Sequence, residues 1–201
     1  ATVCELPAQA FGRDPDSTVA SALSYGFDPH LSELSPYHGG YLAVVESVCR
    51  LAAAGAQPER IRLSLQEYFP RPGASAEKWG LPVAALLGAL GAQLDLGVPA
   101  VGGKDSMSGT YEDLEVPPTL VSFGVATLDP GRATSAAFSF QDSDVLLLHT
   151  PTDESGLPDA GALLRHIATL CELRDRGELR AAGTVRRGGV VVALTRASLG
   201  N

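Results

Sequence analysis

Apolar and polar positions recur with two different periods along the chain, and these periods predict alternating strands and helices. Between Ile61 and Phe69 apolar residues alternate with polar ones, which is typical of a strand with one buried face. The looser alternation of Thr18 to Phe27 also predicts a strand. A short strand is expected at Val98 to Gly102, and the apolar run Pro118 to Leu128 fits a strand buried on both faces or a barrel strand.

Two segments between these strands have the spacing of helices. A helix is expected from Gly39 to Ala54, where an apolar stripe repeats every three or four residues, namely Leu42, Val45, Cys49 and Ala52. A second helix is expected from Glu77 to Leu96, with Pro82 near its effective start.

Small residues, prolines and aspartates between Asp129 and Asp144 indicate a domain boundary. A first domain is therefore expected at residues 1–137 and a second at residues 138–201. The second should contain a strand at Asp144 to Thr150, a helix at Ala160 to Arg176 and a helix over VVVALTRAS. Because about sixty residues is near the lower limit for independent folding, the chain is expected to be a fragment of a longer protein.

The charge and the cysteines exclude several classes of function. A net charge of −8 repels polyanions, so no nucleic-acid partner is expected. The three cysteines, Cys4, Cys49 and Cys171, have neither zinc-site nor disulfide-framework spacing. No signal peptide and no apolar run of membrane-spanning length is apparent, so we expect a cytoplasmic protein without a membrane partner.

Residues 101–109, VGGKDSMSG, have the composition of an anion-binding loop. They do not form a P-loop, because Lys104 is followed by Asp105 instead of Ser or Thr. The glycines permit a tight turn, the lysine offers a point charge and the two serines offer hydroxyl donors. We predict that Gly103, Lys104, Asp105, Ser106 and Ser108 bind a phosphate group. The alternative is a glycine-rich turn whose polar side chains are merely solvated.

Two acids, Asp28 after the first strand and Glu46 within an apolar helix segment, are candidate Mg²⁺ ligands. The alternative for Glu46 is an exposed pair with Arg50 at i,i+4. The residues Gln66, Glu67 and Tyr68 either line a pocket or simply close their strand. His30 and His38 are more consistent with surface histidines than with ligands, and no catalytic triad or Cys–His pair is present, so no catalytic residue is predicted.

Three segments resemble the phosphoribosylformylglycinamidine synthase family, which is also called formylglycinamide ribonucleotide amidotransferase. They are GFDPHLSELSPYHGGYLAVVESV (26–48), LSLQEYF (63–69) and VPAVGGKDSMSGTYEDLEVPPTLVSFGVA (98–126). The resemblance extends from about Ala10 to Asn201, and the GGKDSMSG and VPPTLVSF segments are specific to this enzyme. An origin among related selenophosphate or thiamine-phosphate enzymes is disfavoured, because those proteins lack this pair of segments.

The resemblance implies an α/β (α+β) fold of the aminoimidazole ribonucleotide synthetase superfamily. Enzymes of this family have two homologous halves and a glutaminase domain, and the N-terminal domains of the halves pair into a central β-barrel. The chain is similar to the second half. Residues 1–137 would then be an N-terminal domain, half of a β-barrel flanked by helices, and residues 138–201 the start of a C-terminal α/β domain.

The resemblance also implies a ligase of purine biosynthesis that converts formylglycinamide ribonucleotide to formylglycinamidine ribonucleotide with ATP and glutamine. In this half Asp28 and Glu46 would hold Mg²⁺, and Lys104 to Ser108 would lie near the phosphates of an auxiliary ATP or ADP. The family has asparagine where this chain has Arg50, whose charge could displace a metal ion.

The catalytic histidine of the first half and the nucleophilic cysteine of the glutaminase have no counterpart here, so the fragment alone is expected to be inactive. Its expected partners are those two remaining parts of the enzyme, or a second copy through the edge of the barrel. The alternative function is a structural pseudo-domain that supports the catalytic half and binds no nucleotide.

Overall fold

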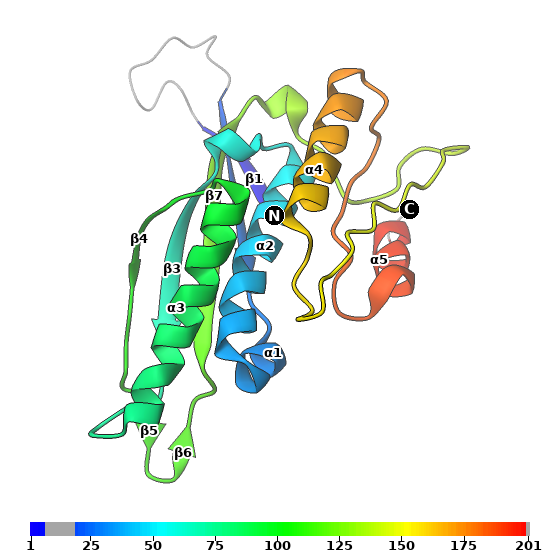
Figure 1. Cartoon of the computed structure of the whole chain (residues 1–201). Coiled ribbons are helices and arrows are strands. Elements are labelled where there is room, and N and C mark those ends of the chain that lie inside the picture. Colours follow the sequence, from blue (N-terminus) through cyan, green and yellow to red (C-terminus); the bar gives the residue numbers. More distant parts are fainter. Residues whose placement is uncertain (7–18, 200–201) are drawn as a thin grey trace. The chain divides into compact units, whose positions relative to one another are not determined.

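A computed structural model describes residues 1–6 and 19–199 of the chain (Figure 1). Five strands form one sheet in the order β1-β2-β7-β3-β4. Their bounds are β1 (Thr2–Glu5), β2 (Ala20–Gly26), β3 (Arg62–Tyr68), β4 (Ala100–Lys104) and β7 (Thr119–Leu128). Strand β3 pairs parallel with β4 and antiparallel with β7, and β1 pairs antiparallel with β2. Two short strands, β5 (Thr110–Tyr111) and β6 (Leu114–Glu115), form a separate hairpin.

Three of the described helices begin at residues whose side chains accept free N–H groups of the first turn. The described helices are α1 (Pro29–Leu34), α2 (Pro36–Ala54), α3 (Ala76–Leu96), α4 (Ala160–Asp175) and α5 (Gly189–Ser198), with 3-10 turns η2 (Pro58–Arg60) and η3 (Pro130–Arg132). The side chains of Asp28, Ser75 and Asp159 accept backbone N–H groups at the starts of α1, α3 and α4. Gly97 ends α3 with a φ of 65°, a left-handed conformation that favours glycine.

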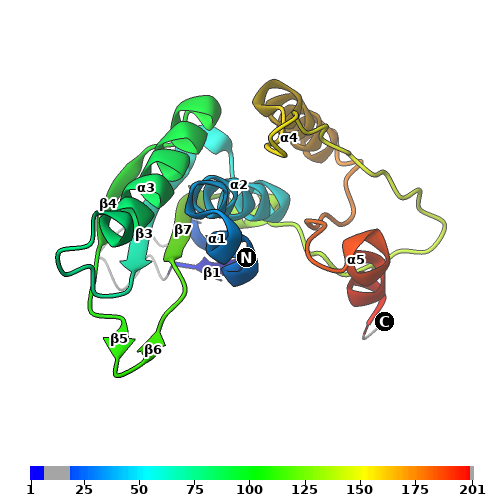
Figure 2. The ribbon, with the colours of Figure 1, turned by 60° about the horizontal axis from the view of Figure 1, so that its bottom comes forward.

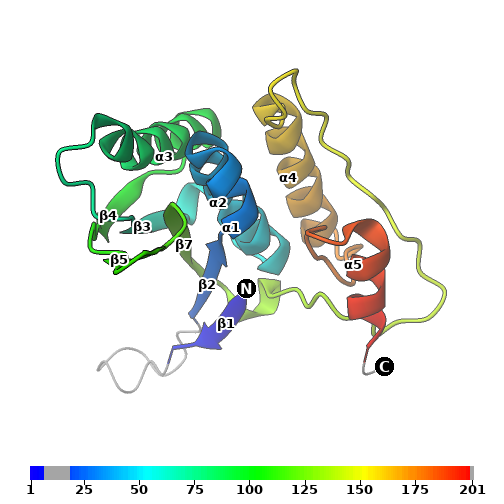
Figure 3. The ribbon, with the colours of Figure 1, turned by 90° about the horizontal axis from the view of Figure 1, so that it is seen from below.

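The predicted α/β fold class is confirmed by this mixed sheet and its helices. Two compact units can be separated: unit 1 comprises Ala1–Leu23, Cys49–Arg60 and Ala126–Asn201, and unit 2 comprises Ser24–Val48 and Ile61–Val125. In unit 2, α3 and the first part of α2 lie on the same face of β3, β4 and β7 (Figures 2 and 3).

Helices α2 and α3 approach each other closely because glycine lies at their contacts. A Cβ on Gly40 would be 2.1 Å from the Ala85 carbonyl oxygen, and one on Gly88 would be 1.9 Å from the Tyr37 carbonyl oxygen. The Tyr41 hydroxyl donates to Asp95 Oδ2 at 2.8 Å and ties α2 to the end of α3. Beneath α2, Ser47 Oγ and Ser122 Oγ are 2.8 Å apart, so the buried hydroxyl on β7 has a partner.

The strands of unit 2 have one buried face. Along β3 the burial alternates strictly, with Leu63, Leu65 and Glu67 buried. Burial on both faces was wrong for β7, because Phe123 is 43% exposed and Val125 39% exposed. Among the described residues of unit 2, no helix or strand covers this second face. The alternative, that β7 is a barrel strand, stays a prediction.

Predictions for the later part of the chain were right for the helices and wrong for the strand. The expected helices at 160–176 and over VVVALTRAS are α4 and α5. The segment Asp144 to Thr150 forms no strand, and Val145 and Leu146 are more than 60% exposed. A strand requires a neighbouring backbone to pair its N–H and C=O groups, and no described segment pairs with this one.

Helix α3 differs from the prediction in two respects. It begins at Ala76, so Pro82 lies inside the helix instead of near its start. Among the described helices, α3 is also the one that is long and apolar enough to cross a membrane, with a mean hydropathy of 1.3. The prediction that no apolar run has membrane-spanning length was therefore wrong. The core helix of a soluble protein can have the same length and composition, and Ala85, Ala89, Ala92 and Leu96 of α3 are buried.

Candidate functional site

The GGKDSMSG loop leaves the sheet where two parallel strands end together. Because β3 and β4 are parallel, their carboxyl ends lie at the same edge of the sheet. Gly102 and Gly103 belong to β4 itself. A Cβ on Gly103 would be 2.3 Å from the Leu65 carbonyl oxygen, so packing against β3 explains this glycine without a ligand.

Backbone hydrogen bonds hold the loop against the end of β3. The Ser106 N–H donates to the Glu67 carbonyl at 3.1 Å, and the Phe69 N–H donates to the Ser106 carbonyl at 2.9 Å. The Ser106 and Ser108 hydroxyl oxygens are 3.0 Å apart, and Lys104 Nζ donates to the Asp105 carbonyl at 3.0 Å. The loop therefore presents one ammonium and two hydroxyl groups, the donor types that bind a phosphate oxygen.

Glu67 also lies at this edge of the sheet, and the sequence left open whether it lines a pocket or closes the strand. It continues the buried positions of β3, is 6% exposed, and its Oε2 atom has no hydrogen-bond partner. Burial raises the pKa of the Glu67 carboxyl, and the negative charge of Asp105 raises it further. Strand alternation alone could have placed Glu67 inside, since it lies two residues beyond Leu65.

Replacing Glu67 with glutamine is expected to change how stability depends on pH. A raised folded-state pKa means that the native state binds more protons, so stability is retained below the ordinary carboxyl value of 4.5 and lost as pH rises through the folded value. The Glu67→Gln variant should exceed the wild type by about 1 kcal/mol in free energy of unfolding at pH 8 and by much less at pH 4. Urea unfolding at both pH values measures this, and Glu154→Gln, at an exposed acid, should behave like the wild type. Parallel pH profiles for the wild type and Glu67→Gln would contradict it.

The two acids predicted to hold Mg²⁺ both contact the turn that follows β2. Asp28 Oδ1 accepts the N–H groups of His30 and Leu31 at 3.0 and 3.2 Å. Glu46 Oε2 accepts the Phe27 N–H at 3.2 Å, so α2 brings its carboxylate to the same turn. Glu46 thus has a contact with this turn, and the alternative of a pair with Arg50 stays a prediction.

The donor set at this turn fits Mg²⁺ in part. One or two carboxylates suffice when a nucleotide phosphate and water supply the remaining ligands. Within residues 1–6 and 19–199, no group of three or more His, Cys, Asp or Glu side chains could hold a metal ion. His38 Nδ1 lies 2.7 Å from Ser35 Oγ, a local contact between α1 and α2 that gives it a structural partner.

The mixed sheet with helices on one face, and the loop at the ends of β3 and β4, define an α/β protein of the aminoimidazole ribonucleotide synthetase-like class. No known protein-family model matches the chain. Its fold is similar to T. maritima PurL complexed with AMPPCP, with a TM-score of 0.67 at 20% identity over 90% of this chain and 29% of that one. T. maritima PurL complexed with FGAR gives 0.66 at 18% identity over 89% and 31%.

The chain is related to the phosphoribosylformylglycinamidine synthase subunit PurL, which confirms the resemblance seen in the sequence. It is 28% identical to that subunit from Cutibacterium acnes over 203 residues, which cover 92% of this chain and 27% of the relative. It is 32% identical to the subunit from Halorubrum lacusprofundi over 151 residues, 74% of this chain and 19% of the relative. The chain thus spans about a quarter or less of the length of these relatives.

Proposed function

We propose that the chain is a segment of the ligase that converts formylglycinamide ribonucleotide to formylglycinamidine ribonucleotide with ATP and glutamine. The observation that carries this is the GGKDSMSG loop, held at the joint end of β3 and β4 in a chain related to PurL along 92% of its length. T. maritima PurL, which is similar in fold, forms complexes with AMPPCP and with FGAR, which supports nucleotide chemistry in the parent enzyme.

In this proposal the segment is the auxiliary nucleotide-binding half. Lys104, Ser106 and Ser108 donate to the phosphates of ATP or ADP, while Asp28 and Glu46 orient the turn after β2 and hold Mg²⁺. The ion, when bound, neutralises phosphate charge. Glu67 lies next to this loop as a buried carboxyl, and the charge of Asp105 contributes to its raised pKa.

Several properties of the parent protein belong to the same proposal. Residues 1–137 form an N-terminal synthetase-like domain and residues 138–201 begin a C-terminal one. The partners are the first synthetase-like half and the glutaminase of a cytoplasmic enzyme, with a second copy as an alternative occupant of the barrel edge. The chain carries no catalytic residue and by itself is inactive.

A structural pseudo-domain is the second candidate, and two contacts favour it. The carboxylates of Asp28 and Glu46 already accept backbone N–H groups, so each has a structural role without a metal. Gly103 is likewise explained by its packing on Leu65. In this alternative the exposed face of β7 supports the catalytic half, and no nucleotide binds.

Binding of Mg-ADP separates the two candidates. The proposed function expects saturable binding by calorimetry that requires Mg²⁺ and weakens at least about tenfold in Asp28→Asn, because asparagine keeps the cap of α1 but removes the ligand charge. Asp159→Asn makes the same change at the cap of α4 and should leave the affinity unchanged. No binding by the wild type, or equal affinity in Asp28→Asn, would support the pseudo-domain.

A further inference from the structure

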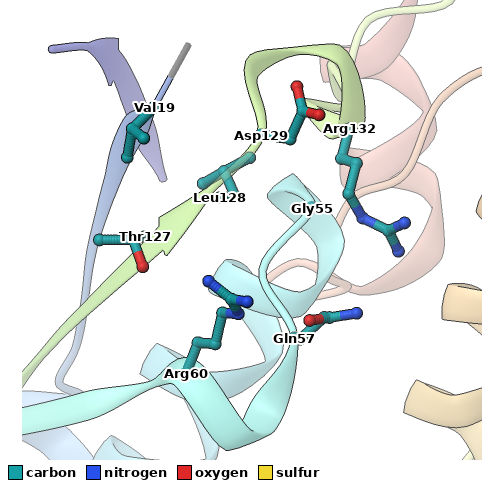
Figure 4. A pocket seen from close by; sticks show the side chains of 8 residues that line it. All are labelled: Val19, Gly55, Gln57, Arg60, Thr127, Leu128, Asp129 and Arg132. Carbon is teal, nitrogen blue, oxygen red and sulfur yellow. The ribbon is translucent and has the colours of Figure 1, made fainter. Parts of the chain in front are cut away.

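A small pocket lies in unit 1, where β7 ends. It has a volume of about 250 Å³. Its lining comes from the residue before β2, the turn after α2, the end of η2, and the end of β7 with η3: Val19, Gly55, Gln57, Arg60, Thr127, Leu128, Asp129 and Arg132 (Figure 4). This volume is smaller than that of drug-sized ligand sites and suits a small ion or a group of similar size.

Two guanidinium groups in this pocket have donors without protein acceptors. Arg132 Nη2 lies 2.6 Å from Asp175 Oδ1, but the Nε atom of Arg132 is buried and has no hydrogen-bond partner. Arg60 is exposed, and its side chain makes no hydrogen bond or ion pair within residues 1–6 and 19–199. A buried donor without an acceptor costs free energy, so an external acceptor at Arg132 would be stabilising.

The acceptors nearest to these groups are already occupied. The carbonyls of Ala52 and Ala53 at the end of α2 accept from Arg174 Nη2 at 2.9 and 3.2 Å. Asp129 Oδ1 accepts the Gly131 N–H at 2.8 Å, and its carboxylate is turned away from both arginines (Figure 4). Among the described residues, neither the helix terminus nor this acid makes a hydrogen bond to the guanidinium groups of Arg60 and Arg132.

A second guanidinium group, that of Arg174, lies within electrostatic range of Arg132. Burial is the main reason that the pKa of Arg174 is lowered, and the charge of Arg132 lowers it further, which places the two guanidinium groups within electrostatic range. Asp175 is the acid paired with Arg132, and its side chain is 52% exposed, so solvent screens part of that pair.

We propose that this pocket binds a phosphate group, as inorganic phosphate or as a small phosphate monoester. Guanidinium groups match the oxygens of a tetrahedral anion with paired N–H donors, and both Arg60 and Arg132 line this pocket. The Gln57 amide and the Thr127 hydroxyl line the same pocket and add neutral donors. Val19 and Leu128 offer apolar contact for the carbon part of a monoester. The site is separate from the GGKDSMSG loop and does not depend on nucleotide binding there.

Calorimetric titration of the full chain with inorganic phosphate, at constant ionic strength against sodium chloride, tests the proposal. Saturable phosphate binding is expected, weakened at least about tenfold in Arg60→Gln. Arg71→Gln removes the same charge at an exposed arginine of unit 2 and should bind phosphate as the wild type does. Arg60 is the better target than Arg132, because Arg132 also pairs with Asp175.

A second variant assigns the bound phosphate to one of the two sites. Lys104→Gln should retain phosphate affinity if the anion binds between Arg60 and Arg132. The proposal is overturned if phosphate produces no more than the chloride response, if Arg71→Gln weakens binding as much as Arg60→Gln, or if only Lys104→Gln weakens it.

Discussion

Gly88→Ala is expected to destabilise the packing of α2 on α3 by about 3 kcal/mol, the upper range for inserting one carbon into a packed core. The added Cβ would lie 1.9 Å from the Tyr37 carbonyl oxygen and 2.8 Å from its carbonyl carbon. These are backbone atoms of α2, so a side-chain rotation cannot relieve the clash and the two helices must separate. Separation would also disturb the reciprocal contact, where Gly40 faces the Ala85 carbonyl.

The same helix provides a control substitution that is expected to raise stability instead of lowering it. Gly80 in α3 has no atom within 4 Å of an added Cβ, so Gly80→Ala is expected to stabilise the helix by about 1 kcal/mol through propensity alone. Urea unfolding monitored by circular dichroism measures both variants. If the two substitutions shifted the unfolding midpoint equally, close helix contact at Gly88 would not be the cause.

Arg174→Ala is expected to lower the free energy of unfolding by about 2–3 kcal/mol, the range for hydrogen bonds that involve a charged group. The guanidinium of Arg174 donates to the carbonyls of Ala52 and Ala53 and, through Nε at 3.0 Å, to Thr134 Oγ1. Its loss leaves the last turn of α2, which has no basic residue of its own, without these donors.

Arg176→Ala is the matched control for this prediction. Arg176 is two residues further along, and its ion pair with Glu172 is 3.6 Å long between side chains that are more than 60% exposed. Such a pair contributes about 0.5 kcal/mol or less, so thermal unfolding should hardly change. Arg174→Lys should lose most of the stability lost in Arg174→Ala, because one ammonium cannot reach three acceptors with the geometry of a guanidinium. Full stability in Arg174→Lys would show that charge alone suffices.

The spacing of apolar residues and the residues typical of turns were sufficient to predict most helices and strands of this chain. The strands at 20–26 and 62–68 and the helices at 36–54 and 160–175 lie close to their expected positions. The failures have specific reasons. Asp144 to Thr150 has the composition of a strand but no described partner strand. Pro82 was assigned to a helix start, although Ser75 caps α3 and the helix begins at Ala76, six residues before Pro82.

The candidate site could be predicted only in part for a related reason. Lys104, Ser106 and Ser108 lie together in the sequence, so their proximity needs no tertiary information. The importance of Glu67 depends on the depth of its burial and on the nearby charge of Asp105, which is 38 positions away along the chain. Gly103 was predicted to contact a ligand, because its packing against Leu65 could not be seen in the sequence.

The sequence by itself determined the alternation of strands and helices, the relationship to the synthase and the identity of the loop donors, since all of these depend on residues near one another along the chain. Only the tertiary structure decided which carboxyl is buried, which glycines allow α2 and α3 to touch, and that Arg60 and Arg132 line one pocket. These properties depend on contacts between segments distant in sequence. Burial, steric exclusion and unmet hydrogen bonding arise only where such segments meet.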